Sequence, residues 1–271
     1  MTPTEEATAA QGWRSVVMMT WDRSHDLELA GLASGAAFWL LLSVFPAGLV
    51  AVNVLGLFVS QDEVARQIGE LAAEAPGTWG DLLGQQLLAV AAPSPGSGPY
   101  DVLLVFVALW TVSTAMVSLL RAVRRVYGLP RTGFLLIRSL AAGVAVTVIT
   151  VVALIAEVID ASTTTGTVLG TVTTAIVLFA LVLGILRVAV GRQIPWRDLA
   201  VGAALGAVGL ILVGAALNVY ANVATNLTLV YGNIAGLVVS MLTVWLGVYV
   251  VLVGALVNTA LHSPRQEGPR P

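Results

Sequence analysis

The sequence predicts an all-α, polytopic integral membrane protein with six transmembrane helices and additional amphipathic helices at the membrane surface. Apolar residues make up 58% of the 271 residues and charged residues only 10%, whereas a soluble domain carries about 25% charged residues. Six apolar runs reach the roughly 20 residues that a helix needs to cross a bilayer. These runs show no period-two alternation, which indicates helices rather than strands.

The composition also narrows the possible functions. The chain has no Cys and only two His, which excludes a thiolate metal site and a disulfide scaffold. The formal net charge of −2 gives no reason to expect a nucleic-acid partner. No phosphate-binding loop or dinucleotide fingerprint occurs. We therefore predict no catalytic residues, no metal and no cofactor, and a protein that is not an enzyme.

Residues 1–29 are predicted to form a cytosolic N-terminal segment with one amphipathic helix. Trp13, Val16, Val17, Thr20 and Trp21 recur at helical spacing on one face, with charged residues off that face. Such a helix suits the headgroup region of a membrane, where Trp is enriched. The alternative is a cytosolic helix that packs on the bundle.

Residues 30–262 are predicted to form the membrane domain, and residues 263–271 a disordered tail. Pro46 interrupts the first span and removes one backbone hydrogen bond there. The predicted spans cover residues 30–60, 100–120, 139–159, 167–186, 199–220 and 234–261.

Two connections are longer than turns. Residues 61–99 contain two stretches with apolar residues at helical spacing and end in a linker rich in Pro, Gly and Ser. They predict two short amphipathic helices on the outer surface, which could form either a lid or a passive cap. Residues 121–138 form an inner segment rich in Arg.

The distribution of Arg predicts the orientation of the chain. With both termini in the cytoplasm, six spans place twelve of the thirteen Arg on the inner side and only Arg66 outside. This asymmetry is the positive-inside pattern of membrane proteins.

Uncharged polar residues at depth are the candidate substrate-contacting groups. Ser43, Pro46 and Asn53 lie in the first span, Asn226 follows the fifth, and Asn258 lies in the sixth. Residues of this kind either join helices through hydrogen bonds or line a polar cavity. Because polar stripes occur in three separate spans, the cavity is the favoured interpretation.

Several stretches together resemble one known family. They are AFWLLLSVFP at 37–46, LWTVS at 109–113, YG at 127–128, PWR at 195–197, the stretch from Tyr220 to VYG at 230–232, and GA at 254–255 with Asn258. In order and spacing they are similar to the motifs of the YihY/BrkB family, and the resemblance covers about residues 25–262. It implies a six-span protein of the bacterial inner membrane, and it adds Ser113 and Tyr231 to the candidate residues.

Two positions depart from the family pattern. Leu256 stands where the family usually has Glu, and Arg124 where it often has Asn. A mechanism that needs the buried Glu is therefore not expected in this chain. Older members are labelled ribonuclease BN, but no cluster of His and carboxylates is visible here that would support phosphodiester cleavage.

We expect a transporter or lipid-handling protein with a polar cavity facing spans one, two, five and six. Membrane lipids and a small-molecule or lipid substrate are the expected partners, and the substrate, the energy coupling and the oligomeric state stay open. The alternative is a non-transporting scaffold that acts through residues 61–99. The cavity candidates are Ser43, Pro46, Asn53, Ser113, Asn226, Tyr231 and Asn258. The candidates for anionic lipid headgroups, which could equally be charges that only set topology, are Arg121, Arg124, Arg125, Arg131 and Arg138.

Overall fold

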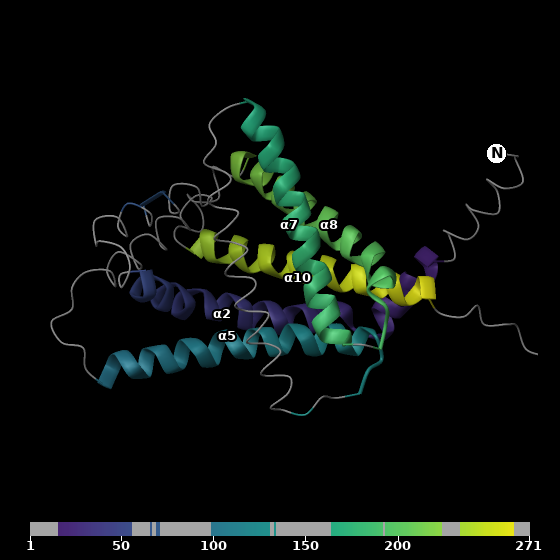
Figure 1. Cartoon of the computed structure of the whole chain (residues 1–271), viewed down its shortest axis with the longest axis horizontal. Coiled ribbons are helices and arrows are strands. Elements are labelled where there is room, and N and C mark those ends of the chain that lie inside the picture. The colour runs from purple at the N-terminus through teal and green to yellow at the C-terminus, as the bar shows by residue number, and fades with distance from the viewer. Residues whose placement is uncertain are drawn as a thin grey trace, which may run out of the picture. The chain divides into compact units, whose positions relative to one another are not determined.

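The protein is all-helical throughout the residues that a computed structural model describes, which confirms the predicted class (Figure 1). These residues are 16–55, 66, 69–70, 99–130, 133, 164–191, 193–223 and 234–262. A first helix, Val16–Asp26, precedes the long helices. The long helices are α2 (Leu29–Leu55), α5 (Pro99–Val126), α7 (Thr164–Val190), α8 (Trp196–Val223) and α10 (Ile234–His262).

Three of the six predicted spans are confirmed as helices that are long and apolar enough to cross a membrane. They are Val172–Val190 in α7, Trp196–Leu217 in α8 and Val238–Leu261 in α10. Only 22–28% of each span is buried inside the protein, so most of its apolar surface faces outward. Apolar faces of this size are stable against lipid and would aggregate in water.

The other three predicted spans are not confirmed as crossing the membrane. The first part of α2, Leu29–Val44, passes the same test only together with the helix Val16–Asp26, from which it is bent by 64°. The helix α5 forms at the second predicted span but is not among the helices that pass. The third predicted span, residues 139–159, lies outside the described residues, so the number six stays a prediction.

Several other predicted segments also lie outside the described residues. These are residues 1–15, the tail 263–271 and nearly all of the outer segment 61–99. Within that outer segment, Arg66 and Glu70 are exposed, one helical turn apart, and joined by a salt bridge with an Nη1–Oε1 distance of 2.5 Å.

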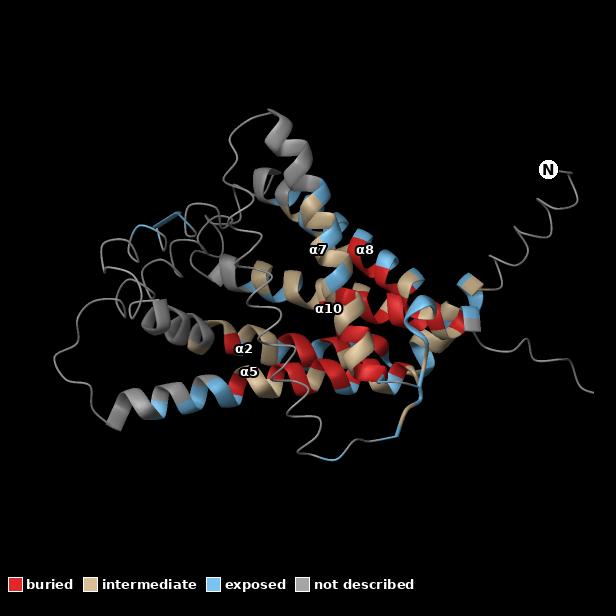
Figure 2. Cartoon of the chain, viewed as in Figure 1, coloured by how far each residue is buried: buried red, intermediate tan, exposed pale blue. Residues whose placement is uncertain are grey.

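The described helices contribute to two compact units. The first contains Met1–Ser34, Leu119–Ile211 and Gly247–Pro271, and the second contains Gly35–Ser118 and Leu212–Leu246. Most buried residues, which Figure 2 colours red, belong to the first unit. Its fully buried larger side chains come from five helices and are Leu29, Leu120, Val123, Val126, Val182, Leu186, Val190, Leu199, Leu252, Leu256 and Asn258.

Glycine allows α8 and α10 to approach closely in the first unit. A Cβ atom at Gly202 would overlap the carbonyl oxygen of Gly254, and a Cβ atom at Gly254 would overlap the carbonyl oxygen of Gly202. A Cβ atom at Gly206 would lie 3.0 Å from Cγ1 of Val182 on α7. In membranes, small residues at such crossings bring backbones together where no hydrophobic effect drives the helices.

The helices α5 and α7 end on glycines in the left-handed conformation. Gly128 has φ 65° and Gly191 has φ 70°, values that a side chain would strain. After α5, Gly128 N–H donates to Arg125 O at 3.1 Å and Leu129 N–H donates to Arg124 O at 3.0 Å. This pair of hydrogen bonds forms the Schellman motif, which satisfies the last helical carbonyls.

The exposed side of the helix Val16–Asp26 differs in part from the predicted one. Val16, Val17, Thr20 and Trp21 were predicted to share one membrane-facing side, but Val17 and Trp21 are exposed while Val16 and Thr20 are half-buried. The hydroxyl oxygen of Thr20 is fully buried. The four residues therefore do not share one surface: two of them lie on the side of the helix that packs against the rest of the protein, and two face outward.

Candidate functional site

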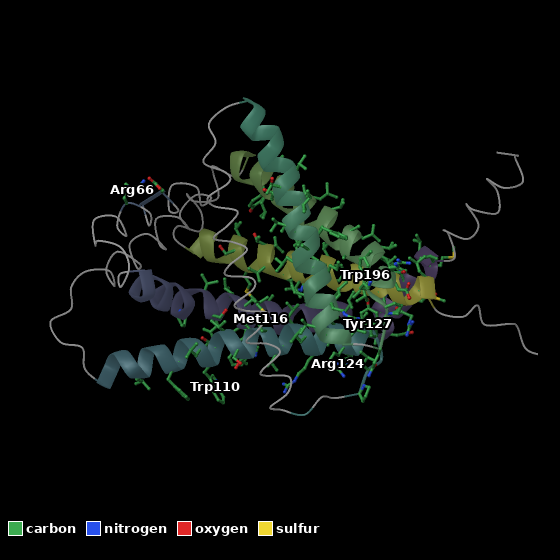
Figure 3. All side chains as sticks on the ribbon, in the orientation of Figure 1. Arg66, Trp110, Met116, Arg124, Tyr127 and Trp196 are labelled. Atoms are coloured by element: carbon green, nitrogen blue, oxygen red, sulfur yellow. The ribbon has the colours of Figure 1, made fainter. Side chains whose placement is uncertain are left out.

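The candidate site lies where four helix ends of the first unit meet: the C-terminal ends of α5, α7 and α10, and the N-terminal end of α8. We call this region the convergent end. Its hydrogen bonds link these helices pairwise, and Figure 3 labels three of its residues, Arg124, Tyr127 and Trp196. The region contains one buried amide and several basic groups.

That amide is Asn258, which is only 2% exposed. Its Oδ1 accepts from the backbone N–H of Gly202 at 2.7 Å. Its Nδ2 donates to the carbonyl of Leu199 at 3.2 Å and to the hydroxyl oxygen of Tyr127 at 3.1 Å. Both amide hydrogens and the carbonyl are therefore used, and the partners set which end of the amide points where. Asn258 joins α10 to α8 and to the end of α5.

Tyr127 lies one residue after the end of α5, and its hydroxyl accepts the hydrogen bond from Asn258. Burial raises the pKa of its hydroxyl, and the hydrogen bond from Asn258 partly opposes that rise because it favours the phenolate. Tyr127 therefore stays neutral over the physiological range. The same amide that ties α10 to α8 thus holds a neutral phenol at the end of α5.

Two arginines are held by backbone carbonyls at the convergent end. Arg124 on α5 donates from Nη1 to Ala189 O on α7 at 2.5 Å and from Nη2 to Pro130 O at 2.9 Å. Its Nε is buried without a partner. Arg187 on α7 donates to Ile194 O at 2.7 Å, which closes the connection to α8. Cations at helix C-termini satisfy carbonyls there and interact favourably with the helix dipole.

Three further arginines of the region are exposed: Arg121 and Arg125 on α5, and Arg197 at the start of α8. The described residues show no ion pair for any of them. In residues 119–130, 187–191, 193–200 and 255–262, five Arg stand against one carboxylate, Asp198. The convergent end is therefore strongly basic. Trp196, beside Arg197, is 60% exposed, as is typical of a membrane interface.

The structure divides the predicted anionic-lipid candidates. Arg121 and Arg125 are exposed, as such a role requires, whereas Arg124 is half-buried and bonded to backbone carbonyls. Arg131 and Arg138 lie outside the described residues. The two neighbours Arg124 and Arg125 differ because adjacent helical positions point about 100° apart, and only the first faces α7.

The predicted cavity candidates are not all in one unit. Asn258 belongs to the first unit, while Ser43, Pro46 and Ser113 belong to the second. Ser43 is 7% exposed and donates to the carbonyl of Leu40 in its own helix at 2.7 Å, and Pro46 lies half-buried inside α2. The side chain of Asn53 and the residues Asn226 and Tyr231 lie outside what the structure describes.

Ser113 differs from Ser34, Ser43 and Thr114 and resembles Thr20, whose hydroxyl oxygen is also buried without a partner. The hydroxyls of Ser34, Ser43 and Thr114 donate to a carbonyl of the preceding turn. The hydroxyl oxygen of Ser113 is buried and has no partner. A buried polar group without a hydrogen bond costs stability.

Replacing Ser113 with alanine is therefore expected to raise the free energy of unfolding by about 1 kcal/mol. Thermal unfolding in mild detergent, followed by Trp fluorescence, would measure the change. Thr114→Val on the same helix is the control, with an expected change within about 0.5 kcal/mol. A loss of stability on Ser113→Ala would mean that this hydroxyl has a partner after all.

Sequence reasoning missed three members of the convergent end. Tyr127 and Arg197 lie in the motifs YG and PWR, to which no role was assigned, and Gly202 was not among the candidates. Their signal is the spacing of small and polar residues near predicted span ends, but which helices meet there depends on tertiary packing. Leu256, where the resembling family has Glu, is fully buried in the apolar core and brings no acid to the region. The described residues contain no cluster of three or more His, Asp or Glu that could hold a metal ion.

Comparison with known protein families gives a match over most of the chain. A family model described as virulence factor BrkB matches residues 20–271. This finding confirms the family resemblance that the sequence indicated. No curated protein and no solved structure matches the chain.

Proposed function

Because this chain belongs to the YihY/BrkB family, whose motifs supply Tyr127 and Asn258, we propose that it is a lipid-handling membrane protein that binds anionic lipid headgroups at its convergent end. The observation that carries the proposal is the set of exposed arginines Arg121, Arg125 and Arg197, which have no ion pair in the described part of the chain. The proposal includes no covalent chemistry.

The surroundings of these arginines support a phosphate-bearing partner. A guanidinium offers a rigid fork of donors that matches phosphate oxygens in a bidentate way. Arg124 and Arg187 use their donors on backbone carbonyls, which stiffens the helix ends around the exposed groups. Trp196 adds an amphipathic ring of the type that sits at headgroup level.

The competing explanation is that these arginines only set the topology of the chain. It makes a different prediction. Charges that act during insertion are not needed for lipid binding by the folded protein, whereas a headgroup site loses affinity when they are removed. Binding and orientation can be measured separately.

The test is binding of phosphatidylglycerol to the purified protein in detergent, followed by native mass spectrometry and by lipid-induced thermal stabilisation. Each arginine near a phosphate contributes about 1 kcal/mol. The triple variant Arg121→Gln, Arg125→Gln, Arg197→Gln is therefore expected to bind on the order of a hundredfold more weakly. Binding of phosphatidylcholine is expected to change little.

Arg66→Gln is the matched control, since it removes an exposed arginine that is already paired with Glu70. It is expected to leave phosphatidylglycerol binding unchanged. If the triple variant retained full binding but inserted in mixed orientations, the arginines would be topology signals and the proposal would be wrong.

A lipid-handling protein is also expected to move lipid. In liposomes that contain the reconstituted protein, a labelled anionic lipid is expected to redistribute between leaflets faster than in protein-free liposomes. The triple variant is expected to slow this redistribution. Lipid binding without any redistribution would limit the function to lipid recognition.

A further inference from the structure

We propose that the helix Val16–Asp26 lies along the membrane surface, with Val17, Met18 and Trp21 in the boundary between headgroups and acyl chains. Asp22 and Asp26 then face water. This inference does not depend on the proposed lipid-handling function, because it concerns a different surface and needs no specific headgroup.

The exposure pattern of the helix defines three sides. Val16, Thr20, Arg23 and Ser24 are half-buried, and the buried hydroxyl oxygen of Thr20 marks this side as the one packed on the protein. The exposed side divides further at about 100° per residue. One part carries Val17, Met18 and Trp21, of which Met18 is 68% and Trp21 66% exposed. The other carries Asp22 and Asp26, with Met19, which is only 37% exposed, at its edge toward the packed side.

The junction with α2 restricts where this helix can lie. Only residues 27 and 28 separate it from α2, and the two helices meet at a bend of 64°. Glu28 adopts φ 50°, and its carbonyl accepts from the N–H groups of Gly31 at 2.8 Å and Leu32 at 3.1 Å. The bend is therefore a hydrogen-bonded turn that begins α2, and it directs the helix away from the axis of α2.

The exposed side of this helix could face the hydrocarbon core, water or the boundary between the two. Its side chains favour the boundary. Asp22 and Asp26 make a place in the hydrocarbon core costly, because exposed carboxylates avoid it. The adjacent Val17, Met18 and Trp21 make full exposure to water unfavourable. A surface with its apolar and acidic parts side by side fits the membrane boundary. His25 packs its ring on Trp21, with centroids 4.9 Å apart, and so extends the amphipathic part of this surface.

The lack of Cys in the chain makes a direct test possible. Spin labels are attached to single-Cys variants Val17→Cys, Met18→Cys, Asp22→Cys and Asp26→Cys in nanodiscs of phosphatidylethanolamine and phosphatidylglycerol. Power-saturation spectroscopy then compares collisions with oxygen, which concentrates in lipid, and with a water-soluble nickel chelate. Ile176→Cys, on the exposed face of a confirmed apolar span, is the lipid-facing reference.

The labels at positions 17 and 18 are expected to collide more with oxygen, to a smaller degree than the label at position 176. The labels at 22 and 26 are expected to collide more with the nickel chelate. Thermal unfolding checks that each variant is folded.

Three results would overturn the inference. If all four labels collided mainly with the nickel chelate, the helix would stand in water. If all four matched position 176, the helix and α2 would form one broken span. If 17 and 18 were protected from both reagents, a protein surface would cover them.

Discussion

Replacing Gly202 with alanine is expected to destabilise the protein by about 3 kcal/mol. The new methyl group would overlap the carbonyl oxygen of Gly254 and would lie 2.6 Å from Cγ of Asn258. The first obstacle is backbone, which cannot move away as the end of a flexible side chain could. Relief therefore requires α8 and α10 to separate, which also breaks the hydrogen bonds of Asn258. Gly254→Ala is expected to act similarly, since its methyl group would overlap Gly202 O.

Denaturant unfolding in mild detergent would measure this loss, and Gly214→Ala is the matched control. Gly214 lies in the same helix, and a Cβ atom there has no neighbour within 4 Å. Its replacement is expected to be neutral or to stabilise by up to about 1 kcal/mol, as alanine does within a helix. Equal effects of Gly202→Ala and Gly214→Ala would show that the helices do not approach closely.

Replacing Asn258 with leucine, a residue of similar size, is expected to cost about 2–3 kcal/mol. The substitution removes the partner of Gly202 N–H, Leu199 O and the Tyr127 hydroxyl at a position that is only 2% exposed. These groups are then left with fewer hydrogen bonds than they have in the native protein. The free energy of unfolding in detergent is the measurement, and Thr243→Val, which loses one hydrogen bond within α10, is the control.

A double-mutant cycle separates the Tyr127 bond from the other two. Tyr127→Phe alone is expected to cost about 1 kcal/mol. In the Asn258→Leu background it is expected to cost less, because the bond it removes is already absent. Strictly additive effects would mean that the amide and the phenol do not interact in the folded protein.

Much of the fold could be predicted from the sequence because the bilayer imposes a length. The predicted spans 167–186, 199–220 and 234–261 lie within α7, α8 and α10, whose observed ends differ by a few residues. A run of about 20 apolar residues without charges has few alternatives to a spanning helix. The helix Val16–Asp26 was also predicted from the spacing of its apolar residues, but only some of the residues predicted to face outward do so.

The candidate site was less predictable, because its residues come from four helices far apart in the chain. Asn258 was predicted to line a cavity because polar residues recur in three separate predicted spans, with bonding between helices as the alternative. In the structure, its partners are backbone groups of α8, and it reaches them only because Gly202 and Gly254 lack side chains at the crossing. Arg124 and Arg125 were treated alike, and only the position of α7 separates their roles.

The sequence by itself therefore determined the helical class, three helices apolar enough to cross a membrane and the family, since composition, run length and motifs are local properties. Tertiary structure decided which polar groups are satisfied internally and which remain exposed. The physical reason is that a hydrogen bond or a close helix crossing depends on distances of a few ångströms between segments up to 131 residues apart, such as Tyr127 and Asn258. Local periodicity contains no information about such distances.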